Sequence, residues 1–264
     1  MKAALAGTTL HYDVRGRGPA VLFLHAFPLN RAMWDAQVRA LEGTHQVVRF
    51  DARGFGGTPP GDGLLTMERI ADDAVALLDH LGISRATVCG ISMGGYAAFA
   101  LVRRHPLRLA GLVLADTRTA PDSAEARRSR ASQAETVRRQ GPVGIADAFL
   151  QKALGATTHA ERPDLVARIK EMILAAPARG VVDALAGLAA RSDSAETLRE
   201  IRVPTLVVCG AEDALTPVAD AEAIHRGVPG STLEILPRAG HLSALENPGD
   251  FNAALARFLP SVPL

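Results

Sequence analysis

The 264-residue chain contains little cysteine, few aromatic residues and almost no net charge. Its two cysteines, Cys89 and Cys209, both lie in Val-rich segments, which favours buried thiols in strands over a disulfide or a reactive thiol. A reducing, cytoplasmic location is therefore expected. Lys and Arg number 29 against 28 Asp and Glu. This balance predicts no general attraction to nucleic acid or to an anionic membrane surface.

Long hydrophobic runs and several cofactor motifs are also missing. No apolar run approaches the roughly 20 residues of a membrane span, and the apolar stretch near the N-terminus is too short for a secretory signal. The sequence has no HExxH or CxxC metal motif, no phosphate-binding GxxxxGK[ST] loop and no dinucleotide-binding GxGxxG loop. Hydrophobic residues make up 48% of the chain, which excludes a disordered protein.

Short apolar segments alternate with helical patterns along most of the chain. The predicted strands cover residues 10–15, 20–25, 46–51, 86–91, 109–115, 204–209 and 232–236. The predicted helices cover residues 31–41, 66–81, 93–104, 219–226 and 248–258. Strands that alternate with helices predict an α/β fold, with a mostly parallel sheet and helices on both of its faces.

The region from residue 121 to residue 195 breaks this alternation, because it contains helical segments and no clear strand. We interpret it as a helical cap inserted into a core domain made of residues 1–120 and 196–264. The first cap helix carries five arginines, namely Arg127, Arg128, Arg130, Arg138 and Arg139. A solvated helix face is the simpler interpretation of these arginines, and attraction of an anionic substrate is the alternative.

The segment Gly90-Ile91-Ser92-Met93-Gly94-Gly95 lies between a predicted strand and a predicted helix. A sharp strand-to-helix turn needs small residues two positions before and after its centre, and Gly90 and Gly94 occupy those positions. Such a turn exposes a serine hydroxyl above the sheet, at the N-terminus of a helix. Ser92 is therefore the candidate nucleophile, and a Gly-rich turn with Ser92 as a simple helix cap is the alternative.

A serine needs a base to take its proton, and the base needs a group that orients it. His241 follows the strand at 232–236, and Asp213 follows the strand at 204–209. Because parallel strands end at one edge of a sheet, these residues are expected to meet Ser92 there. Asp116 and Glu212 are alternatives to Asp213 as the acid.

Acyl transfer also needs N–H donors for the developing oxyanion. The amide of Met93, directly after the nucleophile, is one expected donor. The loop His25-Ala26-Phe27-Pro28 follows a central strand, and the amide of Phe27 is the second candidate, because Pro28 has no N–H. His25 itself is interpreted as a structural residue that bonds the loop backbone.

These motifs resemble the serine esterase and lactonase branch of the α/β-hydrolase-fold enzymes. The resemblance also includes Gly210-Ala211-Glu212-Asp213, Gly240-His241 and the loop Asp51-Ala52-Arg53-Gly54-Phe55-Gly56. The segments Met33-Trp34-Asp35 and 241–247 are similar to those of 3-oxoadipate enol-lactonases and small carboxylesterases. The resemblance implies an eight-stranded sheet, a cis peptide bond between Phe27 and Pro28, and Cys89 and Cys209 on strands that flank the strand at 109–115.

The resulting hypothesis is a serine hydrolase that cleaves a small carboxylic ester or lactone and needs no metal or cofactor. Ser92, His241 and Asp213 are its expected catalytic residues. Perhydrolysis, hydrolysis of C–C bonds and acyl transfer use the same residues and remain alternatives, as does a ligand-binding protein without turnover. Phe149, Leu150, Trp34 and Met172 are candidates for lining the substrate pocket, with core packing as the alternative for each.

Overall fold

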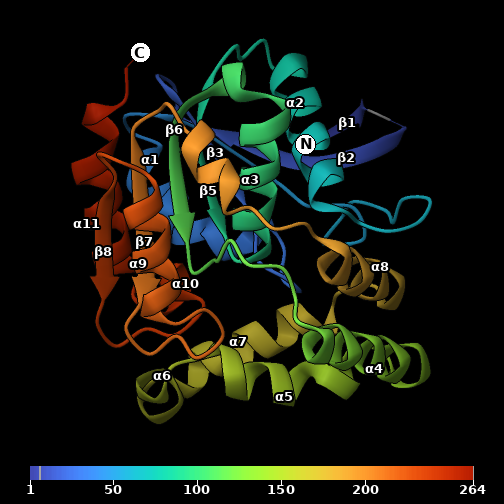
Figure 1. The fold of residues 1–264 in the computed structure, drawn as a ribbon. Helices are drawn as coiled ribbons and strands as arrows, with labels where there is room; N and C mark the ends of the chain where they lie inside the picture. Colours follow the sequence, from blue (N-terminus) through green and yellow to red (C-terminus); the bar gives the residue numbers. More distant parts are fainter. Residues whose placement is uncertain (6, 264) are drawn as a thin grey trace.

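The computed structural model describes residues 1–5 and 7–263, and its centre is an eight-stranded sheet (Figure 1). The strand order is β1-β2-β4-β3-β5-β6-β7-β8. β2 runs antiparallel to both of its neighbours, and the pairs from β4 to β8 are parallel. The strands are β1 (Lys2–Leu5), β2 (Thr8–Arg15), β3 (Ala20–Leu24), β4 (Gln46–Phe50), β5 (Ala86–Ile91), β6 (Leu109–Ala115), β7 (Thr205–Gly210) and β8 (Thr232–Leu236). The predicted α/β fold with a mostly parallel eight-stranded sheet is confirmed.

The central strands are covered on both faces, as their unbroken apolar sequences predict. Every residue of β5 and β7 is buried. Cys89 on β5 and Cys209 on β7 flank β6 and are both free thiols, as expected. The sequence analysis did not predict β1, whose four residues form the edge of the sheet beside β2. So short a segment carries too little alternation of apolar and polar residues to identify a strand.

Helices cover the sheet on both faces and form one hydrophobic cluster with each. α2 (Met67–His80), α3 (Met93–Arg104) and α9 (Val218–Gly227) pack on one face. α1 (Asp35–Leu41) and α11 (Pro248–Phe258) pack on the other. α2 begins where expected, since the Thr66 side chain accepts a hydrogen bond from the amide of Arg69. The predicted helix at 31–41 is divided, because Arg31–Trp34 forms a 3₁₀ turn before α1.

Five α-helices lie between β6 and β7 in the sequence, and we call them the cap helices. They are α4 (Ala124–Gln140), α5 (Val143–Ala153), α6 (Ala156–Glu161), α7 (Pro163–Leu174) and α8 (Ala178–Ala190). In Figure 1 the helices α4 to α7 lie below the sheet, beyond the carboxyl ends of the parallel strands. The cap helices therefore cover the sheet edge at which the sequence places the candidate catalytic residues.

Two close contacts between glycine and the core fix α8 in place. A Cβ atom at Gly180 would lie 1.9 Å from the carbonyl oxygen of Gly54, and one at Gly187 would lie 1.9 Å from that of Leu65. Side chains larger than hydrogen are excluded at both positions unless the backbone moves. These glycines let α8 approach the core backbone directly.

The start of α6 is fixed to the core by a buried carboxylate. Glu246, in the short helix α10 (Ser243–Glu246), accepts hydrogen bonds from the amide of Gly155 at 2.8 Å and from the hydroxyl of Thr158 at 2.6 Å. Its other oxygen accepts from the amide of Leu242, at 3.0 Å. Because Leu242 directly follows His241, this end of the cap is joined to the segment that carries the candidate base.

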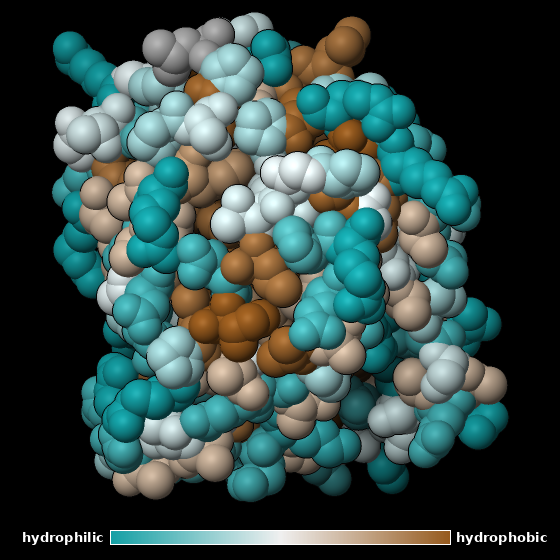
Figure 2. All heavy atoms as spheres, turned by 60° about the vertical axis from the view of Figure 1, so that its left-hand side comes forward, coloured by the Kyte–Doolittle hydropathy of each residue, from teal (hydrophilic) through white to brown (hydrophobic). Residues whose placement is uncertain are grey.

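One face of the molecule is mainly hydrophilic (Figure 2). On the side of the molecule shown in Figure 2, polar side chains cover most of the face and hydrophobic ones gather in a small central area. Among the described residues, no single helix has the length and apolar character needed to cross a membrane. The pair α7 and α8, bent by 95° at its break, meets those criteria together, by length and composition alone.

Candidate active site

Ser92 lies at the sharp turn between β5 and α3 and has a φ of 53°. Few residues other than glycine adopt such a conformation, and it costs roughly 1–3 kcal/mol. The flanking glycines make the turn possible: a Cβ at Gly90 would lie 2.2 Å from the oxygen of Gly94, and a Cβ at Gly94 would lie 2.1 Å from that of Leu24. Both glycines thus have the steric role that the sequence predicted for them.

The structure brings Ser92, His241 and Asp213 into one hydrogen-bonded chain. Ser92 Oγ lies 2.7 Å from His241 Nε2, and His241 Nδ1 lies 2.9 Å from Asp213 Oδ2. A carboxylate only accepts hydrogen bonds, so Nδ1 carries the proton and Nε2 is free to accept from the serine hydroxyl. His241 and Asp213 are buried, with 4% and 6% of their surface exposed.

The carboxylate of Asp213 is held by further donors. Oδ1 accepts from the amides of Leu215, at 2.8 Å, and Thr216, at 2.9 Å. Oδ2 accepts from the hydroxyl of Thr216, at 2.7 Å, as well as from His241. Thr216 was missed by the sequence analysis. A threonine three residues after a candidate acid, just before a helix, is the signal that could have identified it.

Burial and charge act in opposite directions on the pKa values of this pair. Burial alone would raise the pKa of Asp213, but the charge and hydrogen bond of His241 and the hydrogen bonds from Thr216 lower it. Burial alone would lower the pKa of His241, but Asp213, with smaller effects of Asp116 and Glu246, raises it above its ordinary value. The carboxylates around the ring therefore outweigh the effect of burial on the pKa of His241.

The two alternative acids have other partners. The carboxylate of Asp116 accepts from the amide of Gly210 at 2.9 Å and from the amide and hydroxyl of Ser243. Glu212 accepts from the amide and hydroxyl of Thr157 in α6. Neither carboxylate bonds the imidazole, whereas Asp213 does.

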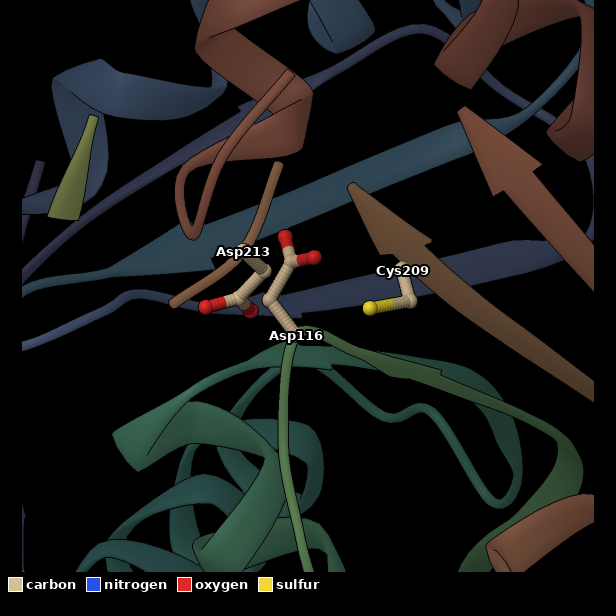
Figure 3. A group of neighbouring side chains, drawn as sticks. All are labelled: Asp116, Cys209 and Asp213. Atoms are coloured by element: carbon tan, nitrogen blue, oxygen red, sulfur yellow. The ribbon is translucent and has the colours of Figure 1, made fainter. Parts of the chain in front are cut away.

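Asp116, Asp213 and Cys209 lie close together, and their candidate metal-binding atoms are within 4.8 Å of one another (Figure 3). Each carboxylate oxygen in this group already accepts at least one N–H or O–H hydrogen bond. Burial raises the pKa of the Cys209 thiol, which opposes the thiolate form that binds metals. The group therefore fits a hydrogen-bond network better than a set of metal ligands.

The amides of Phe27 and Met93 lie on the two loops expected to hold an oxyanion. Among residues 1–5 and 7–263, neither amide has a hydrogen-bond acceptor. The Phe27–Pro28 peptide bond is cis, as the resemblance implies. His25 supports the loop as expected: its Nδ1 lies 2.9 Å from the oxygen of Ala26, and its Nε2 accepts from the amide of Ala52 at 3.0 Å.

A cavity of about 410 Å³ opens above Ser92 and His241. Phe149 lines it, as expected, together with Phe27 and Tyr96 from the core and Ile145 from α5. The expectation that Trp34 and Met172 line the pocket is wrong, as it is for Leu150.

Trp34 is fully buried and packs against Phe23 and Phe251, with ring centroids 4.6 Å and 6.0 Å away. Leu150 belongs to the same hydrophobic cluster, Met172 packs against it, and neither lines the cavity. Core packing, the alternative considered for each of these residues, is therefore their role.

The cavity wall carries positive charge. Arg118, Arg130 and Lys152 line it, together with one carboxylate, Asp122. Asp122 is buried and is shared by Arg130, Arg118 and the buried Arg191. Three guanidinium groups therefore contact a single carboxylate, and the Lys152 side chain lines the same cavity.

Most of the arginines noted in the sequence lie elsewhere. Arg127 and Arg128 are exposed, and Arg138 and Arg139 pair with Glu135 on the surface of α4. Only Arg130 of that group lines the cavity. The solvated helix face is thus correct for four of the five arginines, whereas Arg118 and Lys152, which line the cavity, were not predicted from the sequence.

Comparison with known proteins places these features in context. A family model described as alpha/beta hydrolase fold matches residues 19–248. The chain is 32% identical to 3-oxoadipate enol-lactonase 2 of Acinetobacter baylyi, over 93% of this chain and 91% of that protein.

Two solved structures have the same fold throughout. A thermophilic esterase from Thermogutta terrifontis, solved with malate bound, has a TM-score of 0.94 and 41% identity, covering 98% of this chain and 96% of its own. The enol-lactonase from Burkholderia xenovorans LB400 has a TM-score of 0.92 and 30% identity, covering 98% of this chain and all of its own.

Proposed function

Because this chain belongs to the α/β-hydrolase-fold family, we propose that it is a serine hydrolase that cleaves a small carboxylic ester or lactone through an acyl-enzyme on Ser92. The observation that carries the proposal is the chain of hydrogen bonds from Ser92 Oγ through His241 to Asp213, at 2.7 Å and 2.9 Å. The likeness to an esterase and to enol-lactonases supports the same class of substrate.

In the first half of the proposed reaction, Ser92 Oγ attacks the carbonyl carbon while His241 Nε2 takes its proton. The carbonyl oxygen becomes an oxyanion, and the amides of Phe27 and Met93 are its proposed donors. Asp213 stabilises the imidazolium that forms and keeps the proton of neutral His241 on Nδ1. His241 then gives its proton to the departing alkoxide oxygen, which leaves an acyl group on Ser92.

In the second half, His241 removes a proton from a water molecule that attacks the acyl carbon. The tetrahedral intermediate collapses, Ser92 regains its proton from His241, and the acid is released. Apart from substrate and water, the proposed reaction steps use only side chains and backbone amides of this chain. We further propose that residues 121–195 act as a cap that sets substrate choice, because α4 and α5 supply much of the cavity wall.

Hydrolysis of p-nitrophenyl esters and simple lactones of increasing acyl length, by wild-type protein and by Ser92→Ala, tests the proposal. The variant is expected to lose about 10⁴–10⁶-fold in kcat. Ser84→Ala, at an exposed position outside the cavity wall, is a matched control and is expected to keep wild-type activity. Wild-type turnover by Ser92→Ala would contradict the mechanism.

Labelling with a fluorophosphonate distinguishes the enzyme from a ligand-binding protein that lacks turnover. Rapid labelling of Ser92 in the wild type, together with acyl-enzyme turnover, is expected for the enzyme. Slow or absent labelling, with tight binding of a lactone or ester that is not consumed, favours the binding protein.

The charges of the cavity favour one group of substrates, namely esters or lactones that carry a free carboxylate. The positive charges of Arg118, Arg130 and Lys152 outnumber the single negative charge of Asp122 in the cavity wall. In addition, the buried Nε of Arg118 has no hydrogen-bond partner among the described residues. A guanidinium group binds a carboxylate through charge-assisted hydrogen bonds.

The preference is tested with a monoester of a dicarboxylic acid and a neutral ester of the same length. In Arg118→Gln, kcat/KM for the charged ester is expected to fall about tenfold or more, through KM, with the neutral ester little affected. Arg128→Gln, at an exposed position of α4, is the matched control. Equal losses for both esters would argue against a carboxylate subsite.

A further inference from the structure

The turn Ala115–Thr117 at the end of β6 contacts the loop that carries the candidate nucleophile. β6 lies between β5, which leads to Ser92, and β7, which leads to Asp213. The oxygen of Ala115 accepts from the amide of Ser92 at 2.9 Å. The hydroxyl of Thr117 donates to the oxygen of Ser92, at 3.2 Å. Both polar backbone groups of Ser92 that face the sheet are therefore bonded to this turn.

The middle residue of the turn, Asp116, contacts the other two loops. Its Oδ1 accepts from the amide of Gly210, whose own oxygen accepts from the amide of Asp213 at 3.1 Å. Its Oδ2 accepts from the amide of Ser243, at 3.1 Å, and from the Ser243 hydroxyl. Ser243 is two residues after His241. One side chain thus joins the acid loop to the histidine loop.

Asp116 holds this position in unfavourable surroundings. Its φ is 43°, only 1% of its surface is exposed, and its carboxylate lies beside that of Asp213 (Figure 3). Burial and the charge of Asp213 raise the pKa of Asp116 well above the ordinary value. The residue lies outside the cavity wall, so contact with substrate does not account for a buried, strained carboxylate at this point.

We infer that Asp116 is a positioning residue, which holds the loops of Ser92, Asp213 and His241 at their mutual distances through the turn Ala115–Thr117. This inference rests on the proposed function. A small displacement of reacting groups can cost about 10²-fold in rate. Loss of the Asp116 hydrogen bonds is therefore expected to slow the chemical step while leaving substrate binding largely unchanged.

The test compares Asp116→Ala, Asp116→Asn and Ser243→Ala with wild type in two assays on folded protein. One assay gives kcat and KM for p-nitrophenyl butyrate, and the other gives the rate constant for labelling of Ser92 by a fluorophosphonate. In Asp116→Ala, kcat and the labelling rate are expected to fall together by about 10²-fold, with KM within about threefold of wild type. Asp116→Asn is expected to recover about tenfold, because its amide oxygen still accepts from Gly210.

The control is Asp73→Ala. Asp73 lies on α2, and its fully buried carboxylate is bonded to the Arg53 side chain. The Asp73→Ala substitution is expected to lower the melting temperature and leave the labelling rate of the folded protein unchanged. The inference is overturned if Ser92 in Asp116→Ala is labelled at the wild-type rate, or if labelling in Asp73→Ala is slowed by the same factor as in Asp116→Ala. It is also overturned if labelling in Asp116→Asn is no faster than in Asp116→Ala.

Ser243→Ala decides the question if Asp116→Ala does not fold, since it removes only one of the hydrogen bonds to Asp116. Its labelling rate is expected to fall about three- to tenfold, and a wild-type rate would overturn the inference. Failure of the proposed function has a different signature, because wild-type protein would then not be labelled at Ser92 at all, and the inference would fall with it.

Discussion

His241 is the residue whose surroundings make the clearest prediction about pH. As the proposed base, His241 must be neutral to act, and the carboxylates near the ring raise its pKa above the ordinary value of about 6.5. Activity is therefore lost as the pH falls through that raised pKa, so the acidic limb of kcat/KM should lie above pH 6.5. Asp213→Asn removes the charge that raises it, and we expect the limb to move to lower pH while kcat falls about 10³–10⁴-fold. A limb that stays in place in Asp213→Asn would contradict this account.

Gly90 gives a prediction about the turn itself. A methyl group there would lie 2.2 Å from the oxygen of Gly94, so Gly90→Ala must displace the backbone around Ser92. We expect the free energy of unfolding to fall by about 1–3 kcal/mol, with a loss of Ser92 labelling in the folded fraction. Urea denaturation measures the first effect. The control is Gly43→Ala, where a Cβ would meet nothing within 4 Å and stability should not change.

The residues near the strand ends are those that sequence reasoning could identify. Ser92, Asp213 and His241 each follow a strand whose apolar sequence is recognisable, and parallel strands end at one edge. Arg118 carries no comparable signal, because its role depends on which loops face the cavity. Trp34 was wrongly placed in the pocket, because a large aromatic near the start of a predicted helix is equally consistent with a pocket and with the core.

Among the elements, the junction between the cap helices and the core depends on a buried charge cluster. Asp122 bonds Arg191, which is also 4.3 Å from the ring of Tyr96 in α3 and donates to the oxygen of Ala120 at 3.0 Å. Asp122→Ala leaves the buried Arg191 without its carboxylate. We expect the free energy of unfolding to fall by about 3–5 kcal/mol.

The stabilisation of the fold by the Asp122 carboxylate should decrease as the pH falls. Burial alone would raise the pKa of Asp122, but Arg130 and Arg191 lower it. The stabilisation is therefore present above the unfolded value of about 3.9 and is lost as the pH falls through the lowered pKa. Urea unfolding of wild type and Asp122→Asn from pH 7 to pH 3 should show a difference that narrows at the acidic end. The exposed Asp164 provides the control, Asp164→Asn, and a constant difference for Asp122→Asn would contradict the sign.

Cap elements were predicted less well than core elements for a physical reason. Core strands repeat a simple pattern, fully apolar between two helical layers, and the predicted bounds agree with β5, β6 and β8. Cap helices bury only part of their surface, and their sequence does not say which face meets the core. The contacts of Gly180 and Gly187 with the core backbone become visible only once α8 is in place.

For the whole molecule, we predict that the cap helices and the core unfold together. Buried contacts join them at Glu246 near α6, at Gly180 and Gly187 in α8, and between Arg191 and the ring of Tyr96. Units linked by that many buried polar and close-packed contacts have little independent stability. Calorimetry should give a single transition with equal calorimetric and van't Hoff enthalpies. Two separate transitions would show that residues 121–195 form an independent domain.

Most contacts that attach the cap helices lie on other helices than most residues that shape the cavity. The exceptions are Ala153 in α5, which accepts from the amide of His241, and Leu188 in α8, which lines the cavity. α6 and α8 make the close contacts with the core, whereas α4 and α5 supply most of the cap's cavity wall. Attachment and selectivity can therefore vary separately during evolution. Libraries randomised at positions such as Gln133, Ala148 or Lys152 should yield folded catalysts with new substrate ranges, because none of these side chains bonds the core in this structure.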